Sequence, residues 1–305
     1  MVITERLKKR FCKECRIPIN IFVEPYFSSR IMLYEDFYGS KTKWDLFLQE
    51  LGKYNTEEEY FAEYNKVKDE AIKSIKSTAG YSYFLEENMD KFAVETSCTD
   101  KDIFHPINDE RSFLSIDMTK ANFSALYYYD PSIFDVAATW EDFLKKFTDN
   151  QHIINSKYIR QVIFGNCNPR RQVTYEKYLM NKVFEKIKGT PGINDVVSFS
   201  NDEIVFDITE EKYADIYNFF QSFNGKIEGI PVKAQAFNLY KVHNFYTKEI
   251  IFPEKKIEIK CGEPNLLPFL VRALKNENIQ ENDLVFYQNG FLAKYIDYPQ
   301  MEDLI

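Results

Sequence analysis

Histidine and cysteine are scarce in this chain of 305 residues, which contains three histidines and five cysteines. So few histidines leave little material for catalysis by imidazole groups. Cys12 and Cys15 form a CxxC pair, but the other cysteines are scattered and no second pair exists. Two interpretations of the pair stay open: a zinc site with a distant third ligand such as His105, and two ordinary reduced thiols.

Long apolar runs and several common catalytic motifs are also missing. No stretch approaches the roughly 18 apolar residues of a membrane span, and the N-terminus MVITERLKKR lacks the apolar core of a secretion signal. The sequence contains no GxSxG motif, Walker-type phosphate loop, HExxH motif or internal repeat. We therefore expect a cytoplasmic protein outside the enzyme classes that these motifs define.

Aromatic and charged side chains are abundant instead. The chain has 27 Phe and 21 Tyr, and its 45% hydrophobic residues argue for a folded core despite 28% charged residues. Its length suits one large or two modest domains. The formal net charge of −8 argues mildly against a nucleic-acid partner, because neutralisation of phosphates supplies much of such affinity.

A basic segment interrupts this acidic chain. Between residues 151 and 190 there are eight Lys and Arg residues and only two Glu, a net charge of +6. A solvated helix face and a channel for a nucleic-acid backbone are both compatible with such a segment. Under the second interpretation, we predict nucleic-acid contacts by Arg170, Arg171 and Lys177.

Two predicted strands each deliver a carboxylate. The strand-like run at 113–116 ends at Asp117, and the segments VVSF and NDEIVFDITE place Asp202 and Glu203 at the tip of a predicted hairpin. Aspartates at neighbouring strand ends suit a divalent metal for phosphoryl transfer, since Mg²⁺ typically takes one or two carboxylates plus substrate phosphates. The alternative is an ordinary surface turn built of turn-favouring residues.

A predicted helix lies between these strands, in the segment SKYIRQVIFGNCNPRR. On a helix, Lys157, Arg160 and Phe164 share one face because they are spaced by three and four residues. Two cations and an aromatic ring on one face suit a triphosphate with a base stacked above it.

In this order, three segments resemble the palm and fingers of the DNA polymerase I-like, A-family polymerases. SIDMTKANF resembles the first motif, RQVIFG resembles the end of the nucleotide-binding finger helix, and NDEIVFDI resembles the His-Asp-Glu motif with its following strand. The resemblance covers residues 113–208, about a third of the chain.

The resemblance implies two-metal nucleotidyl transfer. Asp117 and Asp202 would hold two Mg²⁺ or Mn²⁺ ions, and Glu203 would support them. The implied partners are a nucleic acid primer–template and nucleoside triphosphates. Replication partner proteins are also implied, because the chain has no room for a proofreading exonuclease domain of the usual kind.

The resemblance also assigns the nucleotide-binding residues. Arg160, Phe164 and Gly165 occupy the places of the Lys, aromatic residue and Gly that meet the incoming nucleotide. Lys157 would assist with the phosphates. Asn122 would lie near the sugar, at the place of a Glu that acts against the ribose 2′-hydroxyl, which leaves the preference between dNTP and rNTP open.

The segments also depart from the family pattern. Arg160 cannot readily give up a proton as the usual Lys can. Asn168 stands in place of a second finger aromatic, Pro169 is predicted to end the helix, and Asn201 replaces the motif's His. These departures favour a rival interpretation, a non-catalytic polymerase-like accessory or nucleic-acid-binding protein. A template-independent nucleotidyltransferase is a third, and the small size would suit a virus or mobile element.

The predicted fold is α+β, with a polymerase-like palm, in which helices back a small antiparallel sheet, and with helical fingers. Residues 1–110 would form a mostly helical, thumb-like region, 111–235 the palm and fingers, and 236–305 an α+β extension of unknown role. Within the first region, 18–34 is β-tending, while 44–53 and 56–77 have helical periodicity. Later turns are predicted at 189–192 and, in a hairpin, at 288–290.

Overall fold

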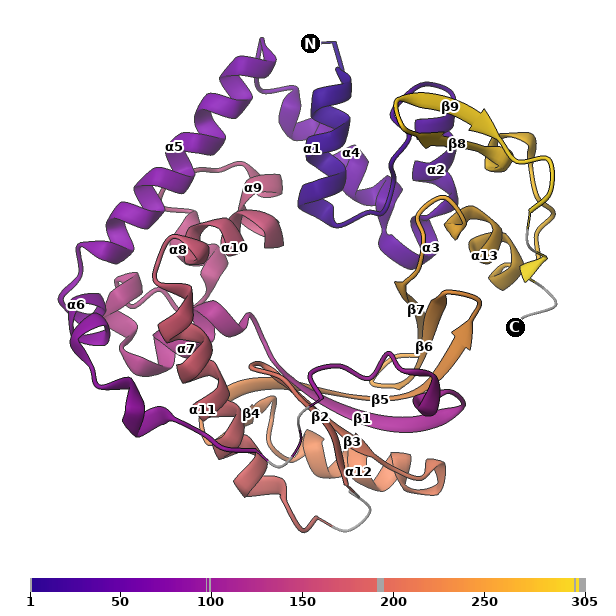
Figure 1. The fold of residues 1–305 in the computed structure, drawn as a ribbon. Helices are drawn as coiled ribbons and strands as arrows, with labels where there is room; N and C mark the ends of the chain where they lie inside the picture. The colour runs from indigo at the N-terminus through magenta and orange to yellow at the C-terminus, as the bar shows by residue number, and fades with distance from the viewer. Residues whose placement is uncertain (1, 97, 99, 191–194, 299, 302–305) are drawn as a thin grey trace.

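The computed structural model describes residues 2–301 except 97, 99, 191–194 and 299. Its elements form a ring around a central opening (Figure 1). N-terminal helices form one arc, an antiparallel sheet with helices beneath it forms the opposite arc, and C-terminal elements lie next to the N-terminal helices. The predicted α+β class is confirmed. The predicted turn at 189–192 lies partly outside the described residues.

The N-terminal part is helical, as predicted. It contains α helices and short 3₁₀ helices, the latter labelled η: α1 (Glu5–Cys15), α2 (Tyr26–Leu33), α3 (Glu35–Tyr38), α4 (Ser40–Leu51), α5 (Glu57–Lys76), α6 (Ala79–Glu86), η1 (Met89–Phe92) and η2 (Pro106–Asn108). Thr4, Thr56 and Thr78 begin α1, α5 and α6, and each side chain accepts a hydrogen bond from the N–H three residues later.

The β-tending segment predicted at 18–34 is wrong for its second half, which forms α2. In the first half, Ile17, Ile19 and Ile21 are buried, but this extended stretch belongs to no strand. The alternation of apolar residues there reflects packing of an extended segment against the helical core, so that period-two burial arises without a sheet.

The sheet is antiparallel throughout, with strands in the order β2-β3-β1-β5-β6-β7 and β4 paired to β5. Its strands are β1 (Arg111–Met118), β2 (Val196–Phe199), β3 (Glu203–Asp207), β4 (Lys226–Ile227), β5 (Ile230–Val242), β6 (Phe245–Phe252) and β7 (Lys256–Cys261). The predicted hairpin of β2 and β3 and the predicted strand before Asp117 are therefore confirmed. The long β5–β6 hairpin was not predicted from the sequence. The domain boundary predicted after residue 235 falls inside β5.

The two faces of the sheet have different surroundings. Leu114 and Ile116 of β1 and Phe206 of β3 are buried in the main core, and helices α11 (Pro169–Ile187) and α12 (Tyr213–Gln221) contact the sheet. Ser115 and Asp117 alternate with these apolar residues and so lie on the opposite face. Figure 1 shows α12 beneath the sheet and the opening above it. The sheet therefore presents a polar end of β1 toward the opening.

Helices connect β1 to β2. They are α7 (Ala121–Tyr129), η3 (Pro131–Phe134), α8 (Trp140–Leu144), α9 (Gln151–Asn155), α10 (Lys157–Gly165) and α11. Pro169 does not end α10 but occupies the first position of α11, where its missing N–H costs nothing and its fixed φ suits a helix. Asn168, with φ of 55°, turns the chain from one helix into the next.

The C-terminal elements close the ring. They are α13 (Leu267–Leu274), η5 (Glu281–Leu284) and the hairpin of β8 (Val285–Gln288) and β9 (Phe291–Lys294), whose predicted turn is confirmed. Among the described residues, three polar side-chain pairs join them to the N-terminal part, and we call these pairs the seam: Asn20 with Asn265, Arg30 with Asp283, and Asp36 with Lys275. Within the described chain, no helix combines the length and apolar character needed to cross a membrane.

Candidate functional site

The pairing of β1 with β3 brings the two predicted metal-binding aspartates together. Asp117 lies opposite Glu203 in the ladder, and the Met118 N–H donates to the Asp202 carbonyl at 2.7 Å. Asp117 and Asp202 therefore lie at adjacent strand ends, at one end of the strands of the sheet. The sequence placed each at a strand end, and antiparallel pairing supplies their proximity.

The carboxylates of this pair influence each other. Partial burial raises the pKa of Asp202, and the negative charge of Asp117 raises it further. Asp117 Oδ2 pairs with Lys233 Nζ at 2.8 Å. Burial disfavours the charged form of Lys233, but its hydrogen bond to Asp117 and the negative charges of Asp117, Glu258 and Glu203 together outweigh burial and raise its pKa. Lys233 is opposite Asp117 in β5, so the same register that forms the sheet places this cation at the site.

Glu203 occupies the same face of the sheet as Asp117. Ser115 Oγ donates to the Glu203 carboxylate, and the Glu203 N–H donates to Ser200 Oγ at 3.0 Å. These contacts hold Glu203 at the start of β3, one residue after Asp202. It is therefore placed to support the pair, as the sequence predicts, without replacing either aspartate.

A third carboxylate near Asp202 was not foreseen from the sequence. Glu176 on α11 is 3% exposed, and Asn122 Nδ2 donates to its Oε1 at 2.8 Å. Burial, together with the charge of Asp202, raises the pKa of Glu176 to about 7. A signal was available, because Glu176 falls on the buried stripe of α11 with Gln172 and Leu179. Asn122, predicted to lie near a sugar, instead holds this carboxyl.

Replacing Glu176 by Gln should remove a pH dependence of stability. In the folded chain the pKa is about 7 instead of 4.5, so stability is lost as pH rises from 4.5 to about 7. The loss amounts to about 3 kcal/mol. Gln can still accept from Asn122 but does not ionise. Urea unfolding at pH 5 and pH 8 should therefore show a smaller decrease for Glu176→Gln than for the wild-type chain.

Glu185→Gln is the matched control for that experiment, since Glu185 is an exposed residue of the same helix paired with Lys188. It should reproduce the wild-type pH dependence. An unchanged decrease in Glu176→Gln would show that Glu176 is ionised in the folded chain at both pH values.

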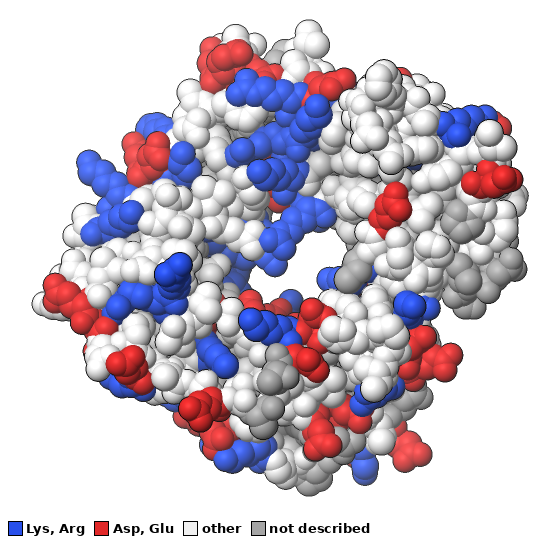
Figure 2. Space-filling model, viewed as in Figure 1, with Lys and Arg blue, Asp and Glu red and all other residues white. Residues whose placement is uncertain are grey.

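Cations face these carboxylates from α10 and α1. Lys157 and Arg160 lie in the first half of α10, and the Arg16 guanidinium at the end of α1 donates to Gln161 of α10. We call Arg16, Lys157 and Arg160 the cation cluster. Figure 2 shows basic side chains gathered along the upper rim of the opening and acidic ones below it.

The cation cluster has unsatisfied charge. Burial lowers the pKa of Lys157, and the charges of Arg16 and Arg160 lower it further. Burial and Arg16 also lower the pKa of Arg160, against the effect of Glu141. Neither Lys157 nor Arg160 forms an ion pair with a residue that the structure describes, and Arg160 Nε is buried without a hydrogen-bond partner. Such a cluster is suited to a polyanionic ligand.

The carboxylates and the cation cluster are near enough to interact. Asp117 favours the charged form of Lys157, and Lys157 favours the charged form of Asp202. The sequence predicted both the carboxylates and the cations of α10, which come from segments about 40 to 85 positions apart. It did not predict the contribution of Arg16. The fold thus creates one site with an acidic and a basic side.

Phe164 was predicted to stack on an incoming base, and this prediction is wrong. Its side chain is 1% exposed and packs against Trp140 and Phe134, with ring centroids 5.3 and 6.1 Å away. The ring completes an aromatic core between α8, α10 and η3, so it offers no free face to a base. Gly165 ends α10 and has open space around its Cα.

The predicted nucleic-acid contacts have different environments. Arg171 donates to the carbonyls of Phe84 and Glu87 at the end of α6, so its guanidinium has a structural role that the sequence did not predict. Arg170 is exposed at the start of α11. Lys177 is half-buried, with its ammonium 6.0 Å from the Phe199 ring centroid.

The carboxylates at these strand ends fit a hard divalent cation. Asp117 and Asp202 offer oxygen ligands whose mutual repulsion a cation would relieve, and Mg²⁺ needs no more than one or two carboxylates from a protein. Among the residues that the structure describes, no group of three or more His, Cys, Asp or Glu forms a complete metal cage. Cys12 and Cys15 accordingly have no third ligand in that set, and burial raises the pKa of each thiol to about 12.

Comparisons of the chain with protein-family models, curated proteins and solved structures found no match.

Proposed function

We propose that the chain is a template-directed nucleotidyltransferase of the DNA polymerase I-like type, which extends a primer with nucleoside triphosphates. The observation that supports this most directly is that Asp117 and Asp202, at adjacent strand ends, lie near Lys157 and Arg160, which form no ion pair with a described residue. The antiparallel sheet backed by helices and the helical segment that carries the cations agree with a palm and fingers. The basic rim of the opening suits a nucleic acid strand.

In the proposed reaction, the primer 3′-oxygen attacks the α-phosphorus, and the bond from that phosphorus to the pyrophosphate oxygen breaks. Arg160 and Arg16 would bind the phosphates and neutralise the negative charge that develops on the leaving pyrophosphate. Lys157, with its lowered pKa, can donate a proton to that leaving group, which Arg160 cannot. The proton of the 3′-hydroxyl passes to water.

Asp117 and Asp202 would hold two Mg²⁺ or Mn²⁺ ions in this proposal. When bound, such ions lower the pKa of the attacking hydroxyl and stabilise charge on the phosphates. Asp117 must exchange its contact with Lys233 for the cation, so Lys233 would become free to bind a phosphate oxygen. Glu203 would remain tied to Ser115 and orient the aspartates.

A second candidate is a non-catalytic nucleic-acid-binding protein that retains a polymerase-like fold. Two observations favour it: the finger aromatic Phe164 is buried, and Asp117 already has a cationic partner in Lys233. The cation cluster would then bind a nucleic-acid backbone rather than a triphosphate. Both candidates predict salt-dependent binding of nucleic acid, but only the first predicts turnover.

Primer extension tests the proposal. A labelled primer on DNA and RNA templates would be incubated with Mg²⁺ or Mn²⁺ and with either dNTPs or rNTPs, and products resolved by length. Template-dependent extension that chelation with EDTA abolishes would support the enzyme. Binding of primer–template without extension under any of these conditions would favour the second candidate, and extension without a template would indicate a template-independent transferase.

Arg160→Gln should separate binding from stability. Arg160 is half-buried without an ion-pair partner among the described residues, so its removal should leave the free energy of unfolding unchanged or slightly higher. Loss of charge-assisted hydrogen bonds to phosphate should weaken nucleoside triphosphate binding by about 10- to 100-fold. Equilibrium binding of a fluorescent nucleotide and urea unfolding would measure the two effects.

The matched control is Arg170→Gln, which removes an exposed arginine near the start of the next helix. Its affinity for the triphosphate should stay within about two-fold of wild type. Equal losses in the two variants would mean that Arg160 acts only through the general charge of the segment.

A further inference from the structure

The burial of Phe164 removes the predicted binding surface for the base, and a separate cavity lies just past the end of β1, the strand that carries Asp117. The cavity has a volume of about 430 Å³ and lies between α7 and the turn from β4 to β5. Thr119, two residues after Asp117, is part of its wall, and the Thr119 N–H donates to the Pro231 carbonyl at 2.9 Å on the other side. A site of this volume is within the range of small-molecule pockets.

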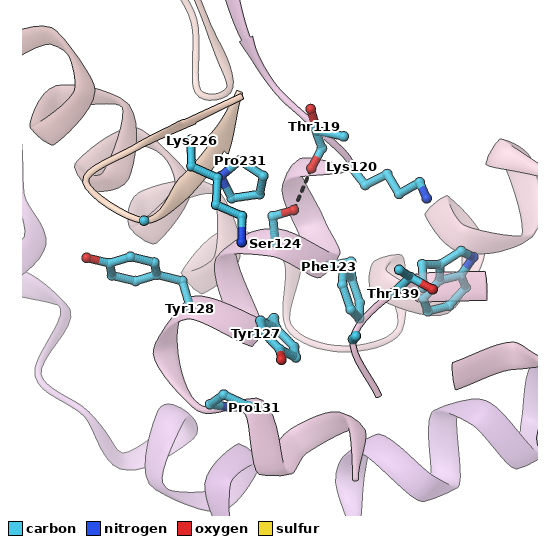
Figure 3. Close-up of a pocket in the computed structure, with 13 residues that line it drawn as sticks. Thr119, Lys120, Phe123, Ser124, Tyr127, Tyr128, Pro131, Thr139, Lys226 and Pro231 are labelled. Atoms are coloured by element: carbon cyan, nitrogen blue, oxygen red, sulfur yellow. Dashed lines mark hydrogen bonds between the residues drawn. The ribbon is translucent and has the colours of Figure 1, made fainter. Parts of the chain in front are cut away.

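Aromatic rings form much of the cavity wall. Phe123 and Tyr127 of α7 lie with their ring centroids 5.5 Å apart and their planes at 29°. Figure 3 shows both rings on the same side of α7, with Pro131 below Tyr127. Trp140, at the start of α8, lies behind this wall and is fully buried. Flat apolar walls of this kind suit a planar heterocycle, which gains stacking energy with little dependence on its identity.

Polar side chains line the cavity from more than one side, with Lys226 across from Lys120 and Thr139. Lys226 reaches from β4 across the cavity toward Ser124, whose hydroxyl donates to the Thr119 carbonyl (Figure 3). Lys226 forms no ion pair with any residue in the described part of the chain. An apolar cavity with one free ammonium and several hydroxyls matches a ring that carries carbonyl or sugar oxygens, and not a purely apolar ligand.

The cavity is connected to the cation cluster by an ionic chain. Lys120 lines the cavity and pairs with the Glu141 carboxylate, and the charge of Glu141 acts in turn on Arg160. A ligand in the cavity would therefore have the aspartates on one side and the cation cluster beyond its rim.

We propose that this cavity binds the base and sugar of a nucleotide whose phosphates lie toward the cation cluster. The inference rests on the proposed function, because it assigns the nucleoside subsite of the same reaction. Tyr127, which is half-buried, would contact the base, and Lys226 would contact an oxygen of the base or sugar. A nucleotide can arrive as a free triphosphate or as part of a strand, and the two sources share this chemistry.

Binding of mant-ATP, a fluorescent ribonucleotide, measured by anisotropy in Mg²⁺ tests the proposal. Ala138→Phe fills the cavity from an exposed wall position, and Tyr127→Ala removes an aromatic face. Each should weaken mant-ATP binding by about ten-fold. The inhibition constant of inorganic tripolyphosphate, which has no base, should change by less than about two-fold in both variants. The matched control is Ala214→Phe, an exposed alanine on α12, which should bind as wild type.

The outcomes separate this inference from the proposed function. If Arg160→Gln weakens mant-ATP binding but neither cavity variant does, the nucleoside lies elsewhere and only this inference fails. In another outcome, mant-ATP does not bind but a labelled oligonucleotide does. If the cavity variants then weaken binding of the oligonucleotide, the cavity binds a nucleotide of a strand. If neither probe binds the wild-type chain, both fail. Circular dichroism spectra verify folding, and Lys226→Ala, at an exposed side chain, replaces any variant that does not fold.

Discussion

Asp202→Asn is expected to lower nucleotide incorporation by about 10³-fold or more, because it removes one of the two carboxylates proposed to hold the metal ions. Stability should not fall with activity. Burial and Asp117 raise the pKa of Asp202, so ionisation of this carboxyl is less favourable in the folded than in the unfolded chain, and a neutral amide of the same shape avoids that cost. Single-turnover primer extension and urea unfolding would measure the two quantities.

Asp207→Asn is the control on the same strand. Asp207 ends β3 and pairs with Arg111 at 3.0 Å, away from the cation cluster. Its variant should incorporate nucleotides at close to the wild-type rate. Full activity in Asp202→Asn would exclude the proposed metal-binding role, whereas equal losses in both variants would indicate a general disturbance of the sheet edge.

Asp283→Ala is expected to lower the free energy of unfolding by about 3–5 kcal/mol, the usual cost of removing one partner of a buried ion pair. Asp283 is fully buried and accepts from Arg30 Nη1 and Arg272 Nε, each at 2.9 Å. Arg30 is 3% exposed, so the variant leaves its charge without a counterion in the core. Urea unfolding monitored by circular dichroism would measure the loss.

A neighbouring carboxylate offers a sharp comparison. Glu281 is two residues away and pairs with Lys294, but both side chains are more than half exposed. Glu281→Ala should change the free energy of unfolding by less than about 1 kcal/mol. Similar effects in Glu281→Ala and Asp283→Ala would contradict the assignment of a buried ion cluster to the seam.

The parts of the site that could be predicted from the sequence are those that depend on local structure. Asp117 and Asp202 follow from strand alternation and turn-favouring residues. In the surrounding fold, the start of α5 at Thr56 follows from short-range hydrogen bonding. Each of these features is determined within a few residues of itself, so no knowledge of the tertiary structure is needed.

The parts that could not be predicted depend on which distant segments pack together. Arg16 reaches α10 from the N-terminal part. The buried stripe of α11 identifies Glu176 as a buried carboxyl, but its proximity to Asp202 depends on how α11 packs against β3. Phe164 lies on the expected helix face, but the aromatic cluster around Trp140 buries it. The hairpin of β5 and β6 was not predicted, because its strands mix polar and apolar residues and its turn at His243 and Asn244 contains no glycine.

The seam also determines the order in which the molecule can assemble. Arg30 and Asp283 are 253 positions apart, and joining the ends of a flexible chain of that length costs about 5 kcal/mol of entropy. We therefore expect the sheet and the helical arc to fold first and bring these residues close, so that the ring closes last. Until then α13 is not covered by α2 and exposes apolar side chains that are buried in the closed ring. A weakened seam would consequently appear first as self-association during refolding, before any loss of helix or strand.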